Sequence, residues 1–205
     1  MNKAIFLDRD GTINIDKEYL YKIEDFEFTY KAVEALELLK KNGYKIVIVT
    51  NQSGIARGFY SEEDVTVLHD WLVQYLSQKG IHIDGIYYCP HHPDGVIKKY
   101  AIECNCRKPA LGLYYKAIEE LNVDTAASFA VGDNLRDLSI CSESNIKGIL
   151  ISDQNMDPKG SKKRMTQRDG APELANEIEI VPNLFEAALL IIKKSEALRE
   201  VMNRS

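Results

Sequence analysis

The sequence has 205 residues, of which 45% are hydrophobic and 28% charged, and its formal net charge is −5. This composition is typical of a soluble domain that is large enough to bury its own core, and we expect one domain over residues 1–205. The acidic balance argues against a broad nucleic-acid surface, which needs a basic face. The longest apolar run, 187–192, is too short to cross a bilayer, and residues 1–10 lack the apolar stretch of a signal peptide. We therefore expect a cytoplasmic protein with no nucleic-acid or membrane partner.

Short β-branched runs alternate along the chain with longer segments of helical periodicity. The runs typical of buried strands span residues 4–7, 45–49, 85–88, 128–131 and 147–151, with a weaker one at 179–181. Helical patterns span residues 32–41, 61–78, 111–121 and 135–144, and a last one follows Asn183. This alternation predicts an α/β fold, with an open parallel sheet sandwiched by helices in a Rossmann-like arrangement. Such sheets bind ligands beyond the carboxyl ends of their strands.

The stretch 153–172 differs from the rest of the chain in composition. It has almost no apolar content, and its basic residues are Lys159, Lys162, Lys163, Arg164 and Arg168. We expect a flexible, solvated basic loop, because a segment of this composition cannot bury enough apolar surface to pack. Since the segment follows the fifth predicted strand, a partial lid over a ligand site is a further hypothesis.

Acidic side chains directly follow the first predicted strand. The letters "LDRDGT" place Asp8 and Asp10 two residues apart, ahead of Gly11 and Thr12. Two acids at a strand end can hold a hard cation such as Mg²⁺ through oxygen, while one oxygen of Asp8 remains free to attack. The same letters also fit a plain acidic turn, because Asp-Gly is a common turn signal. Taken alone, the pair leaves both interpretations open.

Polar groups also follow two other predicted strands. The letters "TNQSG" at 50–54 offer hydroxyl and amide groups that suit phosphate oxygens, and "GDNLRD" at 132–137 adds another pair of carboxylates. The letters "RKP" at 107–109 supply two cations just ahead of a predicted helix. Acids, hydroxyls and cations gathered at one edge of a sheet predict a site for phosphoryl transfer.

Three of the four cysteines and two of the four histidines fall within residues 89–109. Cys89 with His91 and Cys104 with Cys106 form two short arms, and four such ligands can close a tetrahedral structural zinc site. His91 is preferred to His92, which stays the alternative ligand, because alternate residues of an extended arm point the same way. A disulfide is disfavoured in a reducing compartment, and a cluster of unligated thiols is the remaining alternative.

The motifs at the strand ends resemble the four-motif set of the haloacid dehalogenase superfamily of phosphatases. The matching positions are Asp8-Arg9-Asp10-Gly11-Thr12, Thr50, Lys108 and Gly132-Asp133 with Asp137. Within that superfamily, the stretches "FLDRDGTIN", "VTNQSGIARG", "YYCPHHP", "CNCRKP" and "VGDNLRD" are similar to the D-glycero-D-manno-heptose 1,7-bisphosphate 7-phosphatases, whose relatives include histidinol-phosphatases. The likeness covers about residues 4–152. No block of cap-domain size separates the motifs, so loops are expected to define the pocket.

The resemblance implies a covalent mechanism. Asp8 would attack phosphorus to form an aspartyl phosphate, and Asp10 would first protonate the leaving oxygen and then activate water. Mg²⁺ would be held by Asp8, the backbone carbonyl of Asp10, and Asp133. Thr50 and Lys108 would bind the transferring phosphoryl group. The zinc interpretation of Cys89, His91, Cys104 and Cys106 is strengthened by the same likeness.

The resemblance also implies a substrate and the residues that contact it. The expected contacts are Asp16, Lys17, Glu18, Tyr19, Asn51, Gln52, Ser53, Arg107 and Asn134. The implied substrate is a small sugar bisphosphate that loses its 7-phosphate, in the biosynthesis of nucleotide-activated heptose for lipopolysaccharide or surface glycans. The alternative within the enzyme class is histidinol phosphate of histidine biosynthesis. A phosphorelay receiver domain and a zinc-dependent nucleic-acid module are competing classes, but neither explains all three strand ends. We expect a monomer.

Overall fold

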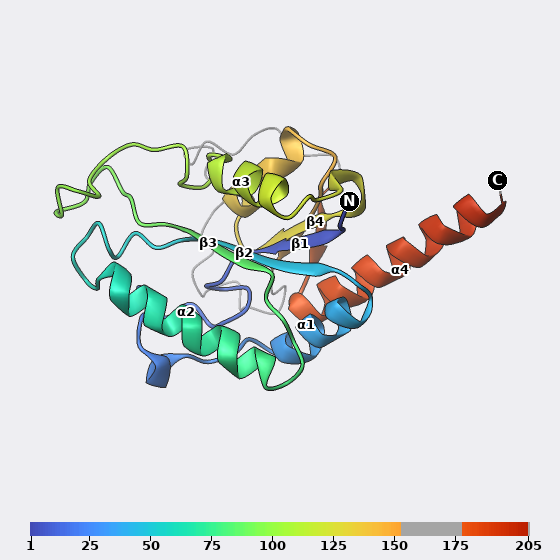
Figure 1. Ribbon diagram of the computed structural model, residues 1–205, viewed down its shortest axis with the longest axis horizontal. Coiled ribbons are helices and arrows are strands. Elements are labelled where there is room, and N and C mark those ends of the chain that lie inside the picture. Colours follow the sequence, from blue (N-terminus) through green and yellow to red (C-terminus); the bar gives the residue numbers. More distant parts are fainter. Residues whose placement is uncertain (153–177, 205) are drawn as a thin grey trace, which may run out of the picture.

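The computed structural model describes residues 1–152 and 178–204 (Figure 1). Six strands form one sheet in the order β3-β2-β1-β4-β5-β6, and every neighbouring pair is parallel. The strands are β1 (Ala4–Leu7), β2 (Lys45–Asn51), β3 (Gly85–Cys89), β4 (Phe129–Gly132), β5 (Lys147–Ile151) and β6 (Glu179–Val181). The predicted open parallel sheet is confirmed. The basic loop predicted at 153–172 lies outside the described residues.

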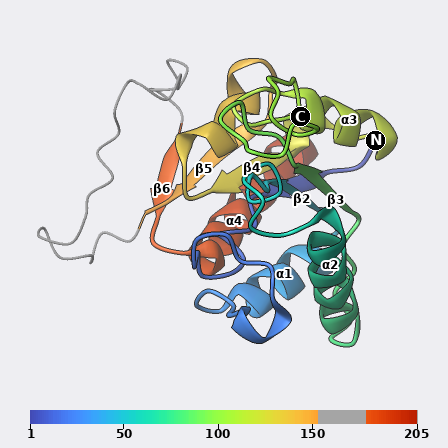
Figure 2. The same cartoon turned by 90° about the vertical axis from the view of Figure 1, so that its left-hand side faces the viewer.

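Helices cover both faces of this sheet (Figure 2). They are α1 (Ala32–Lys41), α2 (Glu62–Ser77), α3 (Gly112–Glu120) and α4 (Leu184–Arg204), with short 3₁₀ helices η1 (Ile23–Asp25), η2 (Thr125–Ala127) and η3 (Leu135–Ser142). The buried side chains of α1, α2 and α4 pack with Ile5 and Leu7 on one face of β1. Those of α3 and η3 pack with Ala4 and Phe6 on the other face. Successive side chains of a strand point to opposite faces of the sheet, which is why neighbouring residues of β1 belong to different sides of the core.

Local signals in the sequence explain where α2 begins. The Ser61 hydroxyl accepts a hydrogen bond from the Asp64 amide, and the Asp64 carboxylate accepts one from the Ser61 amide. This reciprocal capping box satisfies two donors that the helix itself leaves unpaired. None of the helices in the described part of the chain is both long and apolar enough for a membrane span.

The segment predicted as a helix at 135–144 is a 3₁₀ helix, η3, which ends at Ser142. Its serines donate to nearby backbone carbonyls, Ser142 to Ser139 at 2.9 Å and Ser144 to Ile140 at 2.8 Å. The hydroxyl of Tyr114 donates a hydrogen bond to the backbone carbonyl of Asp137 at 2.7 Å. These bonds compete for carbonyls that an α-helix would use, which accounts for the tighter winding.

Strand register brings the polar ends of the strands to one edge of the sheet. Leu7 of β1 lies opposite Ile48 of β2 and Val131 of β4, so the residues that follow these strands are neighbours. Cys89 at the end of β3 lies opposite Asn51 at the end of β2. The stretch 90–111, which carries Cys104 and Cys106, therefore leaves the sheet at the same edge.

Candidate active site and zinc loop

The side chain of Lys108 lies between two carboxylates at this edge. Its Nζ atom is 2.8 Å from Asp8 Oδ1 and 2.8 Å from Asp137 Oδ1, and it donates to the Val49 carbonyl at 2.6 Å. Burial opposes a charge on Lys108, but Asp137 and Asp8 raise its pKa, so the ammonium group stays protonated. Three partners of fixed position leave this cation little freedom to move.

Asp8 directly follows β1, and only 7% of its surface is exposed. Burial raises its pKa to about 7, with Lys108 opposing the shift and the acids Asp137, Asp10 and Asp133 adding to it. Asp8 is therefore a carboxylate in a crowded acidic environment that a nearby cation relieves. Such an environment suits a nucleophile that works beside a metal ion.

The carboxylate of Asp10 accepts hydrogen bonds from three side chains. Asn14 and Gln52 donate to its carboxylate at 2.9 and 3.0 Å, and the guanidinium of Arg9 donates to both oxygens at 2.9 Å. Burial by itself would raise the pKa of Asp10, but Arg9 and these hydrogen bonds lower it below its ordinary value. The same Gln52 amide also donates to the Thr50 hydroxyl at 3.0 Å. Thr50 and Asp10 are thereby fixed relative to each other.

Three carboxylates gather where a metal ion could bind. One oxygen each from Asp8, Asp133 and Asp137 lies within 4.8 Å of the others. Asp133 is solvent-exposed, whereas Asp8 and Asp137 are buried, so the group opens toward one side. Gly11 in the first motif has a φ of 83°, and a Cβ on it would lie 2.3 Å from Asp133 Oδ2. The oxygen ligands and the crowding of negative charge fit a hard cation such as Mg²⁺.

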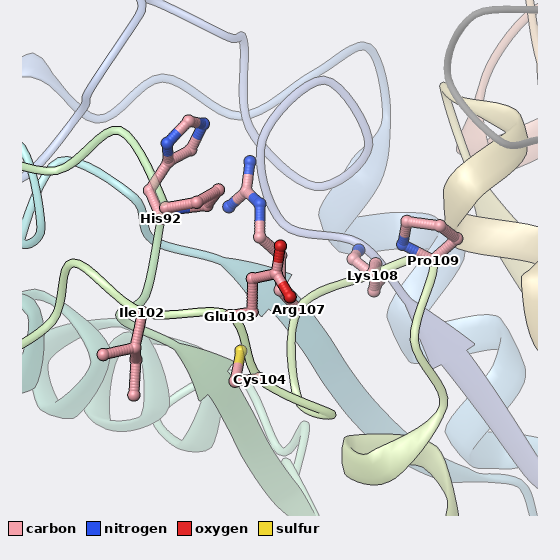
Figure 3. A pocket seen from close by; sticks show the side chains of 8 residues that line it. His92, Ile102, Glu103, Cys104, Arg107, Lys108 and Pro109 are labelled. Atoms are coloured by element: carbon pink, nitrogen blue, oxygen red, sulfur yellow. The ribbon is translucent and has the colours of Figure 1, made fainter.

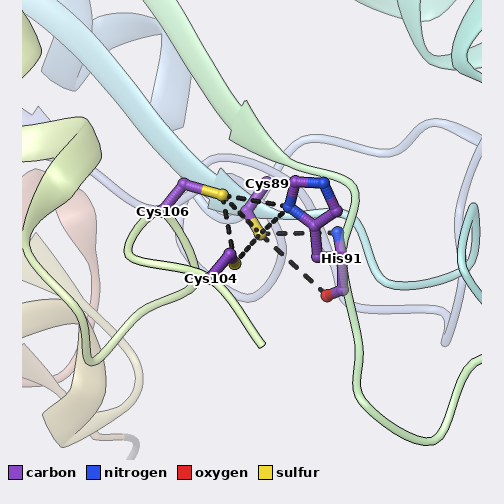
Figure 4. Close-up of side chains that lie close together, drawn as sticks. All are labelled: Cys89, His91, Cys104 and Cys106. Atoms are coloured by element: carbon purple, nitrogen blue, oxygen red, sulfur yellow. Dashed lines mark hydrogen bonds between the residues drawn. The ribbon is translucent and has the colours of Figure 1, made fainter. Parts of the chain in front are cut away.

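The predicted zinc ligands lie together at the base of the loop 89–109 (Figure 4). The Sγ atom of Cys106 is 3.2 Å from the Sγ atoms of both Cys89 and Cys104, and 3.2 Å from Nδ1 of His91. Two sulfur atoms that each lie 2.3 Å from a tetrahedral zinc ion would be about 3.8 Å apart, and the Sγ atoms of Cys89 and Cys104 are 3.6 Å apart. The four cysteines of the chain, all of them described, form no disulfide. The donor set and spacing therefore fit a structural zinc ion.

His92, the alternative ligand, faces elsewhere. Its Nε2 lies 3.0 Å from Nη2 of Arg57, while its neighbour His91 points toward the cysteines. His92 instead contributes to a pocket beside the loop (Figure 3), whose lining residues are His92, Pro93, Ile102, Glu103, Cys104, Arg107, Lys108 and Pro109. The half-buried Arg107 donates to the His91 carbonyl at 3.3 Å. Burial lowers the pKa of Arg107, the thiols of Cys89 and Cys104 oppose this shift, and the positive charges of Arg136 and Arg57 add to it. An anion bound beside Arg107 would relieve the repulsion among these cations.

Several residues expected to contact substrate bond to the protein itself. Asn51 clamps the backbone of Lys108, accepting from its amide at 3.0 Å and donating to its carbonyl at 3.1 Å. Asn134 caps η3 in a capping box with Asp137. Gln52 is 1% exposed and holds Asp10 and Thr50. These three side chains form hydrogen bonds that position other residues of the site. Their contact with substrate stays a prediction.

The other expected contacts lie in two different environments. Ser53 is half-buried beside Gln52, and Asp16, Glu18 and Tyr19 are exposed on the segment before η1. Glu18 and Tyr19 have positive φ of 51° and 58°, and the Tyr19 ring meets Phe59 edge-on at 4.6 Å. Lys17 pairs with Glu27 at 3.2 Å. This segment is therefore a shaped rim with polar and aromatic groups.

Sequence reasoning assigned no role to two residues that the structure brings to the site. Asp137 was recognised in the fourth motif, but its pairing with Lys108 was not expected. His69 lies on α2 and contacts Arg9 at 3.0 Å. The sequence spacing could have indicated that His69 is buried. It follows Val65 by four residues and therefore falls on the apolar face of the helix. A polar residue on a buried helix face indicates a buried hydrogen-bond partner.

Comparison with known proteins decides the family. A family model described as polynucleotide kinase 3 phosphatase matches residues 3–171. The chain belongs to this phosphatase family. The resemblance to the haloacid dehalogenase superfamily, which the motifs predicted, is confirmed by the crystal structure of a protein from Mesorhizobium loti described as a HAD-like phosphatase. That structure is 31% identical to this chain and has a TM-score of 0.69, with coverage of 77% of this chain and 76% of its own.

Individual members of the family are similar over most of the chain. A D-glycero-beta-D-manno-heptose-1,7-bisphosphate 7-phosphatase of Pasteurella multocida is 48% identical over 151 residues, which are 74% of this chain and 82% of the relative. A protein of the same name from Photorhabdus laumondii is 52% identical over 66% of this chain and 72% of its own. The crystal structure of D,D-heptose 1,7-bisphosphate phosphatase from B. bronchiseptica, complexed with magnesium and phosphate, has a TM-score of 0.75 at 30% identity, with coverage of 94% and 99%.

Proposed function

We propose that this protein is a Mg²⁺-dependent phosphatase that removes the 7-phosphate of D-glycero-β-D-manno-heptose 1,7-bisphosphate. The observation that carries the proposal is the position of Asp8, which directly follows β1 and pairs with Lys108 at 2.8 Å beside the carboxylates of Asp133 and Asp137. The choice of substrate and anomer rests on the relatives, which share 46–52% identity with this chain and carry that name. We place the reaction in the biosynthesis of nucleotide-activated heptose for lipopolysaccharide or other surface glycans.

In the proposed reaction, one carboxylate oxygen of Asp8 attacks the phosphorus atom of the substrate. The bond between phosphorus and the sugar oxygen breaks, and that oxygen takes a proton from Asp10 as it leaves. For this step the negative charge of the bound phosphate must raise the pKa of Asp10 from its lowered value, so that Asp10 is protonated when the substrate is in place. Asp10 then removes a proton from water, which attacks the aspartyl phosphate and regenerates Asp8. Thr50 and Lys108 bind the transferring phosphoryl group, and Lys108 offsets the repulsion between Asp8 and the anionic substrate.

A magnesium ion would be held by Asp8, the backbone carbonyl of Asp10, and Asp133. When bound, the ion supplies charge neutralisation for the transferring phosphoryl group. Asp137 keeps its pairing with Lys108, so its part is to position that cation. Two observations support assigning Asp133 to the metal ion and Asp137 to Lys108. Lys108 contacts Asp137 at 2.8 Å, and Asp133 is the exposed member of the three carboxylates.

We further propose that Cys89, His91, Cys104 and Cys106 bind a structural zinc ion. Because Cys106 immediately precedes Arg107 and Lys108, tying the loop to Cys89 fixes both cations relative to β2 and β3. Arg107 would meet the phosphate that the substrate retains. The half-buried Ser53 and the rim residues Asp16 to Tyr19 would meet the sugar.

The test is phosphate release in the presence of Mg²⁺ from the β and α anomers of the heptose bisphosphate and from histidinol phosphate. We expect the β anomer to be preferred, and we expect Asp8→Asn to abolish turnover while the protein keeps its far-UV circular dichroism spectrum and Tm. The matched control is Asp70→Asn, which changes an exposed acid on α2. Preference for histidinol phosphate would overturn the substrate, and turnover by Asp8→Asn would overturn the covalent mechanism.

A further inference from the structure

Arg9 is fully buried, although it is the longest side chain in the first motif. One edge of its guanidinium faces Asp10, with Nε 3.2 Å and Nη2 2.9 Å from Oδ1. The Nη2 atom also donates to the Leu20 carbonyl at 3.0 Å. The remaining nitrogen, Nη1, points away from Asp10 toward α2. Because the guanidinium is planar, whatever holds Nη1 also sets the plane in which the other nitrogens meet Asp10.

His69 is the group that holds Nη1. Its Nε2 lies 3.0 Å from Nη1 of Arg9. His69 is 6% exposed as a residue, and its ring packs edge-on against Tyr88 with 5.8 Å between ring centroids. Arginine has only donors, so Nε2 must accept, and the proton of the neutral ring is on Nδ1. Burial and the neighbouring Arg9 lower the pKa of His69 to about 3, in agreement with a neutral ring.

We propose that His69 is a positioning residue for the reaction, because it fixes Arg9 and, through Arg9, the orientation of the Asp10 carboxylate. A helix on one face of the sheet thereby controls a group at the strand ends. The inference rests on the function proposed above, in which Asp10 transfers a proton to the leaving oxygen. Proton transfer requires a well-defined donor position, so a small rotation of Asp10 slows this step even if Asp8 is unchanged.

The chemistry of the leaving group separates this role from a merely structural one. When a sugar phosphate reacts, the bond from phosphorus to the sugar oxygen breaks with its electron pair on that oxygen, which must take a proton from Asp10. When p-nitrophenyl phosphate or acetyl phosphate reacts, the departing p-nitrophenolate or acetate is stable as an anion and needs no proton. The ratio of kcat/KM for these two kinds of substrate therefore reports on Asp10.

The experiment compares His69→Phe with His69→Gln. His69→Phe keeps a ring against Tyr88 but removes the acceptor, whereas His69→Gln restores an acceptor oxygen near the position of Nε2. For His69→Phe we expect kcat/KM for the heptose bisphosphate to fall about 10-fold, part of the roughly 10²- to 10⁴-fold that proton transfer contributes, while the values for the two activated phosphates change less than about threefold. His69→Gln should recover most of the loss.

The control is Leu68→Ala, which removes a fully buried side chain beside His69 on α2 and should lower Tm without changing the ratio. If His69→Phe does not fold, Arg9→Met with His69→Leu replaces both partners by apolar groups, avoids an unpaired buried donor, and should lower the same ratio. An equal fall for all substrates, or an unchanged ratio in a folded variant, overturns the positioning role. If the wild-type protein releases phosphate from none of these compounds, the proposed function itself fails.

Discussion

The Nζ atom of Lys108 lies 2.8 Å from Oδ1 of Asp8, although 100 residues separate the two in the sequence. The contact depends on two features of the loop 89–109. Asn51, at the end of β2, hydrogen-bonds the backbone of Lys108 on both sides. Cys106, which immediately precedes Arg107, belongs to the cluster of three cysteines and His91. A loop without regular secondary structure thus delivers a buried cation to the end of β1 with a defined geometry.

Removing this cation should cost both stability and activity. In Lys108→Met the carboxylates of Asp8 and Asp137 lose their shared partner, so we expect the free energy of unfolding to fall by about 3–5 kcal/mol. We expect kcat to fall at least about 100-fold, because a charge that binds the phosphoryl group is absent. Urea denaturation and steady-state kinetics measure the two effects.

The double variant Lys108→Met with Asp137→Asn separates these two effects. It removes one of the facing charges along with the lysine, so part of the stability should return while activity stays low. Recovery of activity in the double variant would contradict a direct role of Lys108 in binding the phosphoryl group.

Gly11 should be intolerant of any side chain, because a Cβ there would lie 2.3 Å from an oxygen of Asp133. We expect Gly11→Ala to weaken Mg²⁺ binding at least about 10-fold by displacing that carboxylate, an effect of roughly 1.4 kcal/mol or more. Isothermal titration with Mg²⁺ measures it. Gly80→Ala is the matched control, since Gly80 has a similar φ of 77° but nothing within 4 Å of the added Cβ. Gly80→Ala should lower the free energy of unfolding by about 1 kcal/mol and leave Mg²⁺ binding unchanged. If both variants lost Mg²⁺ affinity equally, the loss in Gly11→Ala would be due to backbone strain and not to the contact with Asp133.

The cysteine cluster predicts about one zinc ion per chain, a number that elemental analysis of the purified protein can measure. Cys104→Ser should lose the ion and lower Tm by roughly 10 °C, because binding energy of the metal is folding energy for the loop. Its kcat should fall as well, since Arg107 and Lys108 lose their anchor. Cys141→Ser is the matched control, because Cys141 lies outside the cluster and should keep the zinc content of the wild type. A zinc-free, fully active wild-type protein would contradict the site.

Asp84 provides a pH-dependent contribution to stability far from the active site. It accepts from Lys40 at 2.9 Å, Lys45 at 3.1 Å and the Ile46 amide at 2.8 Å, and although burial opposes the charge, these bonds lower its pKa. A carboxylate with a lowered pKa stabilises the folded state above its unfolded pKa of about 3.9, and this contribution is lost as pH falls through the folded value.

The corresponding variant is Asp84→Asn, which keeps the shape of the side chain and removes its charge. At pH 7 it should be less stable than the wild type by about 2 kcal/mol, and the difference should shrink below about pH 4. Urea denaturation at pH 7, 5 and 3.5 measures the difference. A gap that stays constant across this range would show that the charge of Asp84 contributes nothing.

Local patterns were sufficient to predict the order of the elements. The buried runs at 4–7 and 147–151 and the helix at 32–41 coincide with β1, β5 and α1, because side-chain periodicity is read within a few residues. The segment at 135–144 was less predictable, since its choice between α and 3₁₀ winding depends on Tyr114, which lies in another helix. Contacts of that kind have no signature in the segment that they affect.

The sequence by itself determined the parallel sheet, the polar groups at its strand ends and the Cys and His arms, because hydrophobic periodicity and motif spacing are properties of short segments. Only the tertiary structure decided which of these groups meet. Lys108 pairs with Asp137 as well as Asp8, Asn51 turns to the loop backbone, and His69 reaches Arg9 across 60 residues. Each of these pairings depends on how strands align and how helices pack on them, and that information is distributed over the whole chain.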